Sequence, residues 1–136
     1  MIRRFNSQDR DSVDRLMVKL QEHFAKVDTS NESLPFKDLG SAHDYMQRML
    51  DDSDSMGGVV YVAEEAGSIV GFVQGVIVSH HLGDDIVFDT THLPRKDGWI
   101  GLLFVEPEQR GKDIGRQLMD KIKTHFESEG CDTLRL

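Results

Sequence analysis

The chain has 136 residues, the length of one domain, and carries 24 acidic against 16 basic side chains, a net charge of −8. This charge argues against a general nucleic-acid-binding protein, because such proteins neutralise phosphates. No apolar stretch approaches the roughly 20 residues that cross a membrane, and the first charged residues lead into no apolar secretory segment. A single cysteine, Cys131, excludes an intramolecular disulfide and a metal site built on several thiols. We therefore expect one domain over residues 1–136 in a reducing, cytoplasmic setting.

The first sixty residues predict a strand at 1–5, a helix that runs to 27, a polar loop at 29–40 and a second helix. Asn6 or Ser7 can cap the first helix, because a short side-chain oxygen accepts a hydrogen bond from the first turn. Its apolar residues recur at helical spacing from Val13 through Phe24 to Val27, which predicts one buried face. The sequence Ser41-Ala42-His43-Asp44 matches a capping box and predicts the start of the second helix.

The middle of the chain predicts a β-hairpin and then a long loop, at residues 59–65, 69–79 and 80–97. Gly71 and Gly75 lie inside the second strand, where glycine often marks a bulge or a close approach of another backbone. Loops of about eighteen residues are uncommon in a compact domain and are often functional.

The last forty residues predict a strand, a helix and a final strand, at 99–105, 113–128 and 132–136. The strand at 99–105 is nearly all apolar, so we expect it to be buried on both faces. A strand, a helix and a further strand imply parallel pairing, whereas the hairpin implies antiparallel pairing. The predicted fold is an α/β protein with a mixed sheet, helices on both faces and the order β-α-α-β-β-β-α-β.

A tight basic loop joins the predicted strand at 99–105 to the helix that follows it. Arg110, Lys112 and Arg116 supply positive charge there, and Gly111 and Gly115 let a ligand approach the backbone. The free N–H groups and the dipole of the helix N-terminus add positive potential, so the loop is suited to a phosphate or pyrophosphate. It matches neither a Walker A loop nor a dinucleotide fingerprint. The alternative is a surface helix with ordinary basic residues.

The segment Arg110-Gly111-Lys112-Asp113-Ile114-Gly115, preceded by Val105-Glu106-Pro107, resembles the [QR]-x-x-G-x-[GA] signature of the GNAT superfamily of acyl-CoA-dependent N-acetyltransferases. The predicted element order along the whole chain also resembles that family's first five strands and three helices. The resemblance implies acetyl-CoA as cosubstrate and an amine as acceptor. It implies direct attack of the amine on the thioester, aided by a backbone N–H group on the carbonyl oxygen and by a base that takes the amine proton.

The resemblance also assigns the residues that contact the cosubstrate. The pantetheine arm would lie along Leu103, Phe104 and Val105. The pyrophosphate would lie in the loop formed by Arg110, Gly111, Lys112, Asp113, Ile114, Gly115 and Arg116. The acyl thioester would lie where the fourth and fifth strands splay apart. No metal is implied.

The sequence departs from the family at two places. Asp113 replaces the middle glycine of the signature; aspartate tolerates unusual backbone angles and can cap a helix, and we expect its carboxylate to point into solvent and to weaken CoA binding. The family usually continues beyond the fifth strand with a helix that often carries a tyrosine acid. Tyr45 and Tyr61 lie far upstream of that position, so no general acid is assigned. An uncovered sheet edge predicts self-association as a homodimer.

The acceptor site is expected to border the long loop, which carries His80, His81, Asp84, Asp85, Asp89 and His92. An acidic rim favours a cationic acceptor, such as a small amine or a protein amine, but these residues could equally be a solvated loop. One of the two adjacent histidines could be the base, because imidazole titrates near neutrality; an exposed histidine is the alternative. A metal site is not expected, since the spacing is not that of metal ligands.

Three further residues have two interpretations each. Glu106 lies beside the cosubstrate strand or turns out to water, Trp99 lines the acceptor pocket or packs in the core, and Cys131 is better explained as buried filler than as a nucleophile. No catalytic residue is therefore assigned. Two alternatives to the enzyme stay open: an acyl-CoA-binding or interaction module without turnover, and a phosphate-binding α/β protein unrelated to CoA.

Overall fold

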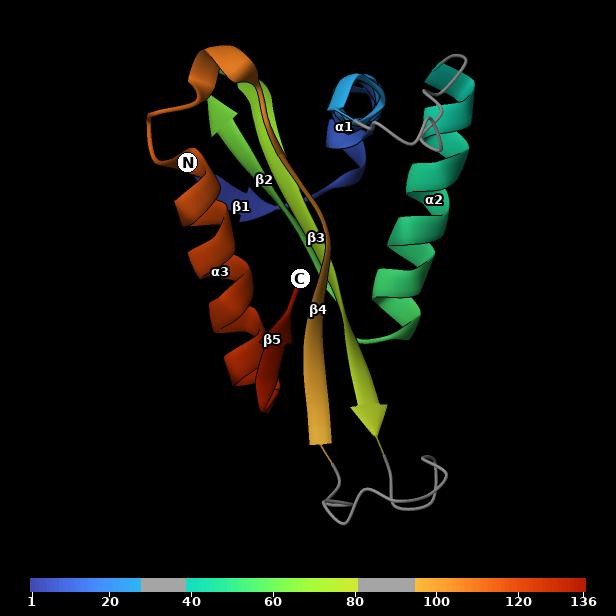
Figure 1. Cartoon of the computed structure of the whole chain (residues 1–136), viewed down its shortest axis with the longest axis vertical. Coiled ribbons are helices and arrows are strands. Elements are labelled where there is room, and N and C mark those ends of the chain that lie inside the picture. Colours follow the sequence, from blue (N-terminus) through green and yellow to red (C-terminus); the bar gives the residue numbers. More distant parts are fainter. Residues whose placement is uncertain (28–38, 81–94) are drawn as a thin grey trace.

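The computed structural model describes residues 1–27, 39–80 and 95–136 (Figure 1). Its elements in chain order are β1 (Ile2–Arg4), the 3-10 turn η1 (Ser7–Asp9), α1 (Arg10–Val27), α2 (Leu39–Ser55), β2 (Val59–Glu65), β3 (Ser68–His80), β4 (Arg95–Val105), the 3-10 turn η2 (Pro107–Gln109), α3 (Ile114–Ser128) and β5 (Thr133–Arg135). This order confirms the predicted β-α-α-β-β-β-α-β arrangement. None of the helices in these ranges is long and apolar enough to cross a membrane.

The five strands form one mixed sheet in the order β1-β2-β3-β4-β5. The first four pair antiparallel, and β5 pairs parallel with β4. Figure 1 shows α3 on one face of the sheet and α1 and α2 on the other. The βαβ unit and the hairpin thus impose the two kinds of pairing that the sequence predicted, with helices on both faces.

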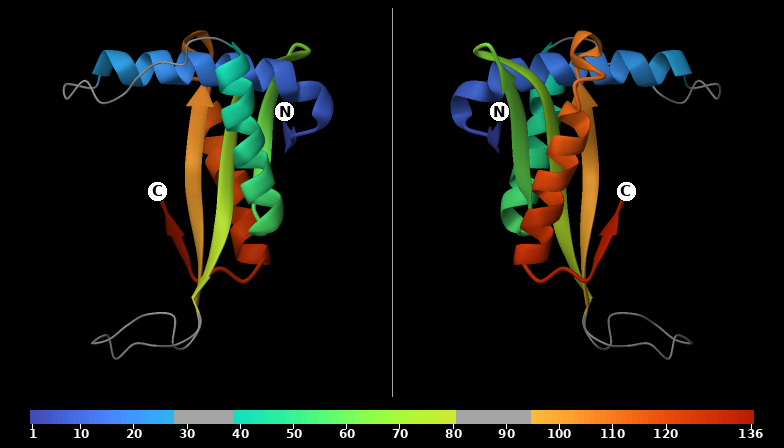
Figure 2. Two further views of the ribbon diagram at one scale, coloured as in Figure 1. Left: turned by 90° about the vertical axis from the view of Figure 1, so that its right-hand side faces the viewer. Right: turned by 90° about the vertical axis from the view of Figure 1, so that its left-hand side faces the viewer.

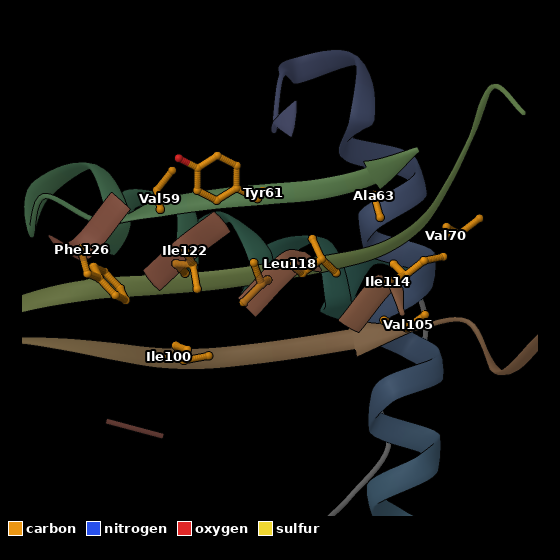
Figure 3. Packing of buried hydrophobic residues seen from close by; sticks show 11 residues of the cluster. Val59, Tyr61, Ala63, Val70, Ile100, Val105, Ile114, Leu118, Ile122 and Phe126 are labelled. Atoms are coloured by element: carbon orange, nitrogen blue, oxygen red, sulfur yellow. The ribbon is translucent and has the colours of Figure 1, made fainter. Parts of the chain in front are cut away.

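Each face of the sheet has its own core. On one face α3 presents Ile114, Leu118, Ile122 and Phe126, all less than 5% exposed, to residues of β2, β3 and β4 (Figure 3). On the other face, the buried residues of α1 and α2 pack against Val62, Phe72 and Phe104 of the sheet. Alternation along each strand therefore distributes apolar side chains to both layers.

Two glycines let α3 approach the sheet closely. A Cβ on Gly75 would lie 2.6 Å from Cζ of Phe126, and a Cβ on Gly98 would lie 2.5 Å from Cδ2 of the same ring. Neither ring nor backbone has room to move within the packed layer. A Cβ on Gly75 would also lie 2.7 Å from the carbonyl oxygen of Trp99, which confirms the close approach of another backbone predicted for Gly75.

Three predicted element boundaries were wrong. The second helix begins at Leu39 rather than at Ser41, so the sequence from Ser41 to Asp44 lies inside its first turns and does not cap it. The strands of the hairpin and of β4 continue to His80 and from Arg95, which shortens the connection between them. Pairing between β3 and β4 as far as His80 and Arg95 extends both strands beyond the range that their side-chain pattern indicates.

The prediction that β4 is buried on both faces was also wrong. Trp99 and Leu103 are each 38% exposed. β5 pairs with β4 only from Asp97 to Trp99, so the second half of β4, which carries Leu103, has no strand on that side within the described residues. This open half of β4 borders the candidate site.

Candidate functional site

A cavity of about 860 Å³ lies at the C-terminal end of β4. One wall is the end of β4, through Leu103, Phe104 and Val105, and a second is the loop from Gln109 into the first turn of α3. Most of the residues assigned to the cosubstrate therefore meet around one cavity. Lys112 and Arg116 belong to the same loop and helix turn, but their side chains do not line it.

The loop between β4 and α3 exposes a run of backbone donors. The N–H group of Arg110 donates to the carbonyl of Pro107 at 3.3 Å, and that of Gln117 donates to the carbonyl of Asp113 at 3.1 Å. Between them, the N–H groups of residues 111–116 have no acceptor within the described part of the chain. Consecutive free donors at the start of a fifteen-residue helix, together with its dipole, form an anion site.

Arg110 is fixed at the entrance of this loop. Its Nε donates to the carbonyl oxygen of Val105 at 3.1 Å, and its guanidinium carbon lies 5.8 Å from the centroid of the Phe104 ring. The two terminal nitrogens make no hydrogen bond to the described residues, so the charge is held over the cavity without being neutralised there. Stacking on a ring restrains a guanidinium while leaving its donors available.

Asp113 adopts the left-handed conformation, with φ of 69°, which confirms the prediction that it tolerates an unusual backbone angle. The prediction that it caps the helix was wrong, because its carboxylate accepts a hydrogen bond from Arg116 instead of from a backbone N–H group. Lys112 in turn donates to the side chain of Gln109 at 3.0 Å. Lys112 and Arg116 thus bind neighbouring side chains, whereas the side chain of Arg110 donates, among the described residues, only to a backbone carbonyl.

The C-terminal half of α1 forms a wall of the cavity that the sequence did not predict. Leu20, His23 and Phe24 line it. Phe24 is 44% and Val27 59% exposed, so the prediction that both lie on a buried face was wrong. Figure 2 shows the reason: this end of α1 extends past β4 and beyond the edge of the sheet.

The open half of β4 carries a bulge. Gln74 pairs with Leu102 and Gly75 with Ile100, so Gly101 is an extra residue without a register partner in β3. It lies two residues beyond the last β4 residue that pairs with β5. An extended ligand can add to such an edge as a further strand.

Glu106, which follows β4, does not turn out to water. Its Oε1 accepts a hydrogen bond from Nζ of Lys19 at 2.6 Å, while its Oε2 is buried and has no partner within the described residues. This ion pair ties α1 to the end of β4. It therefore helps to hold the two walls of the cavity together.

The other candidate residues lie elsewhere or outside the described residues. Trp99 lies on β4 beside β5, with the guanidinium carbon of Arg135 5.6 Å from its ring centroid. Cys131 packs against the α3 core, and burial raises the pKa of its thiol, which favours the unreactive protonated form. Tyr61 is buried at 7% exposure in the α3 core, away from the cavity. The side chain of His80 and the residues His81, Asp84, Asp85, Asp89 and His92 lie outside what the structure describes.

The model of the acetyltransferase (GNAT) family matches residues 20–136, which include the cavity and the loop. The chain belongs to this family. Among curated proteins, no relative matches the sequence.

Solved structures of GNAT acetyltransferases share the fold at low identity. An acetyltransferase from Vibrio fischeri superposes with a TM-score of 0.71 at 24% identity, covering 99% of this chain and 93% of its own. A predicted acetyltransferase with acetyl-CoA from Clostridium acetobutylicum gives a TM-score of 0.67 at 15% identity, with 100% and 79% covered. Glucosamine-6-phosphate N-acetyltransferase from Arabidopsis thaliana gives 0.64 at 20% identity, with 98% and 78% covered.

Proposed function

We infer that this GNAT protein is an acetyl-CoA-dependent N-acetyltransferase that transfers the acetyl group to a primary amine. The observation that carries this proposal is the run of N–H groups at residues 111–116, which have no acceptor among the described residues and lie beside the open edge of β4. One feature fits a pyrophosphate and the other fits an extended amide-containing arm. Coenzyme A combines both in one molecule.

The residues along the cavity match the successive parts of acetyl-CoA: the pyrophosphate, the pantetheine arm and the thioester. The N–H groups of the loop and the guanidinium of Arg110 would bind the pyrophosphate, because donors at a helix N-terminus favour anions. The β4 edge from Leu103 to Val105 would pair with the amides of the pantetheine arm. The arm would then run toward the bulge at Gly101 and place the thioester where β4 and β5 separate.

Acetyl-CoA supplies an activated acyl group, and the protein positions it. The neutral amine forms the new C–N bond as the C–S bond breaks; the amine gives up one proton to a base, and the departing thiolate takes up a proton. An N–H group of β4 directed at the carbonyl oxygen would stabilise the charge that develops there. A cationic acceptor is the expected class, because residues 61–105 carry 6 acidic and 2 basic side chains.

Calorimetric titration of the purified chain with acetyl-CoA, with ATP as the comparison ligand, tests the binding part of this proposal. We expect saturable binding of acetyl-CoA and much weaker binding of ATP, which has phosphates but no pantetheine arm. Arg110→Ala should raise the Kd for acetyl-CoA about tenfold, since a hydrogen bond to a charged group contributes about 1.5–3 kcal/mol. Lys123→Ala is the matched control, because it removes the same charge from an exposed position of α3.

Two results would contradict the proposal. Equal binding of ATP and acetyl-CoA would indicate a phosphate site unrelated to CoA, and equal losses in the two variants would indicate only a general effect of charge. Release of free thiol with a panel of primary amines, followed with a thiol reagent, then tests transfer itself.

A non-catalytic acyl-CoA-binding module is the second candidate function. It is favoured by Asp113, which lines the cavity and places a carboxylate beside the loop that would bind phosphates. Binding of acetyl-CoA without thiol release, for every amine in the panel, would support this module over the enzyme.

A further inference from the structure

Gln74 is a buried polar side chain on the sheet face that α2 covers. It is 2% exposed and lies on β3, between Val73 and Gly75. Burying an amide among apolar groups is unfavourable unless its hydrogen bonds are made inside the protein. The contacts of Gln74 therefore need a physical explanation.

Only one half of the Gln74 amide has a conventional partner. Its Nε2 donates to Oγ of Ser53 on α2 at 3.0 Å, and that hydroxyl donates to the carbonyl oxygen of Gly75 at 3.4 Å. Oε1 is buried and has no hydrogen-bond partner within the described residues. These two hydrogen bonds, which link Gly75, Ser53 and Gln74, fix the orientation of the amide, and its oxygen points away from Ser53.

That oxygen lies against the bulge in β4. A Cβ built on Gly101 would lie 2.5 Å from Oε1 of Gln74, so the amide occupies the space that any larger residue would need. Gly101 is also the residue that β4 inserts between the pairs Gln74–Leu102 and Gly75–Ile100. The side chain of Gln74 thus fills the inside of the bulge, and the anchor on α2 holds it there.

We propose that Gln74 is a positioning residue that fixes the bulge at Gly101 for acyl transfer, and this role rests on the proposed function. With the amide in place, the β4 backbone at residues 101–103 has one conformation, and its N–H groups keep one direction toward the thioester oxygen. A fixed donor stabilises developing charge without reorganising during the reaction. The bond to Ser53 matters because an unanchored side chain of equal size would leave the bulge free to relax.

The variant Gln74→Met tests this role, because methionine keeps most of the volume and loses both polar atoms. Ser53→Ala is the second variant, which removes only the anchor and is the milder change for folding. Gln47→Met is the matched control, since Gln47 also makes side-chain hydrogen bonds, to Arg10 and Asp51, but lies exposed on α2. Thermal unfolding of all three variants separates loss of fold from loss of positioning.

Two binding measurements read the position of the acyl group without turnover. The first is the ratio of the Kd for CoA to the Kd for acetyl-CoA, which we expect to fall several-fold in Gln74→Met and Ser53→Ala while the Kd for CoA stays within about twofold. The second is the ¹³C resonance of the carbonyl in bound [1-¹³C]acetyl-CoA, which should move upfield in both variants as its hydrogen bond weakens. In turnover, kcat should fall on the order of tenfold, and the KM for acetyl-CoA should rise no more than its Kd does.

The outcomes separate this role from the proposed function. A wild-type chain that does not bind acetyl-CoA would overturn both. Wild-type binding with the same Kd ratio and the same carbonyl resonance in Gln74→Met and Ser53→Ala would overturn the role of Gln74 alone. Equal changes in Gln47→Met would assign the effect to general loosening of α2 and would likewise overturn it.

Discussion

Two turns of this protein share one architecture and differ in how their polar groups are used. The first leads from β1 through η1 to α1, and the second leads from β4 through η2 to α3. Each is a strand, a single 3-10 turn and a long helix. The first turn meets its hydrogen-bonding needs from its own side chains, whereas the second does not.

In the first turn, a capping box and a partly buried ion pair provide acceptors for the donors. Oδ1 of Asn6 accepts from the N–H of Gln8 at 2.9 Å, and Oδ2 of Asp9 accepts from the N–H of Asn6 at 2.8 Å. Arg3 then binds both carboxylate oxygens of Asp9 at 2.7 and 2.8 Å. Every group named here has a protein partner, so this turn serves stability.

In the second turn, no side chain caps the helix, and six consecutive N–H groups stay without a protein acceptor in the described chain. The one carboxylate at the start of the helix, that of Asp113, pairs with Arg116 instead. Unmet donors at a helix end cost stability unless water or a ligand satisfies them. A turn whose donors all have protein partners thus supports the fold, whereas a turn with free donors is available for binding.

Breaking the first turn should have the largest effect on stability. Asp9→Asn removes the charge that Arg3 contacts and should lower the free energy of unfolding at pH 7 by about 2 kcal/mol, the order of a hydrogen bond to a charged group. Denaturant unfolding measures this change. The Kd for acetyl-CoA should stay the same, because this turn lies outside the cavity.

The pH dependence of the free energy of unfolding tests whether the ion pair between Arg3 and Asp9 causes this loss. The hydrogen bonds from Arg3 lower the pKa of Asp9 below its ordinary value, against the opposing effect of burial. The stabilisation by this carboxylate is therefore complete above a pH of about 4 and is lost as the pH falls through the lowered pKa of the folded state. The difference between wild type and Asp9→Asn should shrink only below pH 4. A difference that stays constant down to pH 3 would assign the effect to something other than this ion pair.

The sequence predicted the elements and the loop because these depend on local patterns. Helical and alternating periodicity, turn residues and the segment from Arg110 to Gly115 are all visible over short stretches of chain. The family resemblance carried by that segment is confirmed by the match of the family model. The conformation of Asp113 also follows from a local rule, since aspartate is among the few residues that enter the left-handed region.

What the sequence did not predict depends on contacts between distant segments. The exposure of Phe24 results from where the sheet ends beneath α1, and the contact of Lys19 with Glu106 joins residues 87 positions apart. The role proposed for Gln74 needs the bulge register, which no periodicity reveals. The homodimer, the cationic acceptor and the cytoplasmic setting stay predictions.

Two glycines with left-handed backbones, one in the second turn and one after α3, separate effects on binding from effects on stability. Gly111 and Gly130 both adopt the left-handed conformation, with φ of 83° and 80°, and a Cβ on either would have no atom of the described residues within 4 Å. Alanine at either position should therefore cost about 1 kcal/mol of stability from the backbone alone. Gly111→Ala should also raise the Kd for acetyl-CoA on the order of tenfold, because its Cβ and any shift of the loop act where phosphate would bind. Gly130→Ala should leave that Kd unchanged.

The comparison of Gly111→Ala with Gly130→Ala decides whether the backbone of residues 111–116 binds the phosphates. Equal stability losses with unequal Kd values would show that the second turn binds the ligand through its backbone. Equal Kd values in the two alanine variants would contradict the assignment of residues 111–116 to the phosphates.

The smallest effect is expected at Asp113, where a substitution removes the one carboxylate at the start of α3. Asp113→Gly removes a carboxylate from beside the loop and releases Arg116 from its ion pair. Glycine also adopts the left-handed backbone without a Cβ penalty, so stability should stay the same or rise by less than about 1 kcal/mol. We expect the Kd for acetyl-CoA to fall a few-fold, as measured by calorimetry at low salt.

Asp113→Asn separates the two contributions, because asparagine keeps the side-chain volume and tolerates the same backbone angle. If charge is the cause, both variants should bind acetyl-CoA more tightly, and the gain should decrease as salt screens the phosphates. If backbone strain is the cause, only the glycine variant should gain. Weaker binding in both would mean that the pair with Arg116 holds the first turn of α3 in its binding conformation. Asp113 would then stabilise the second turn, from β4 to α3, in the way that Asp9 stabilises the first turn, from β1 to α1.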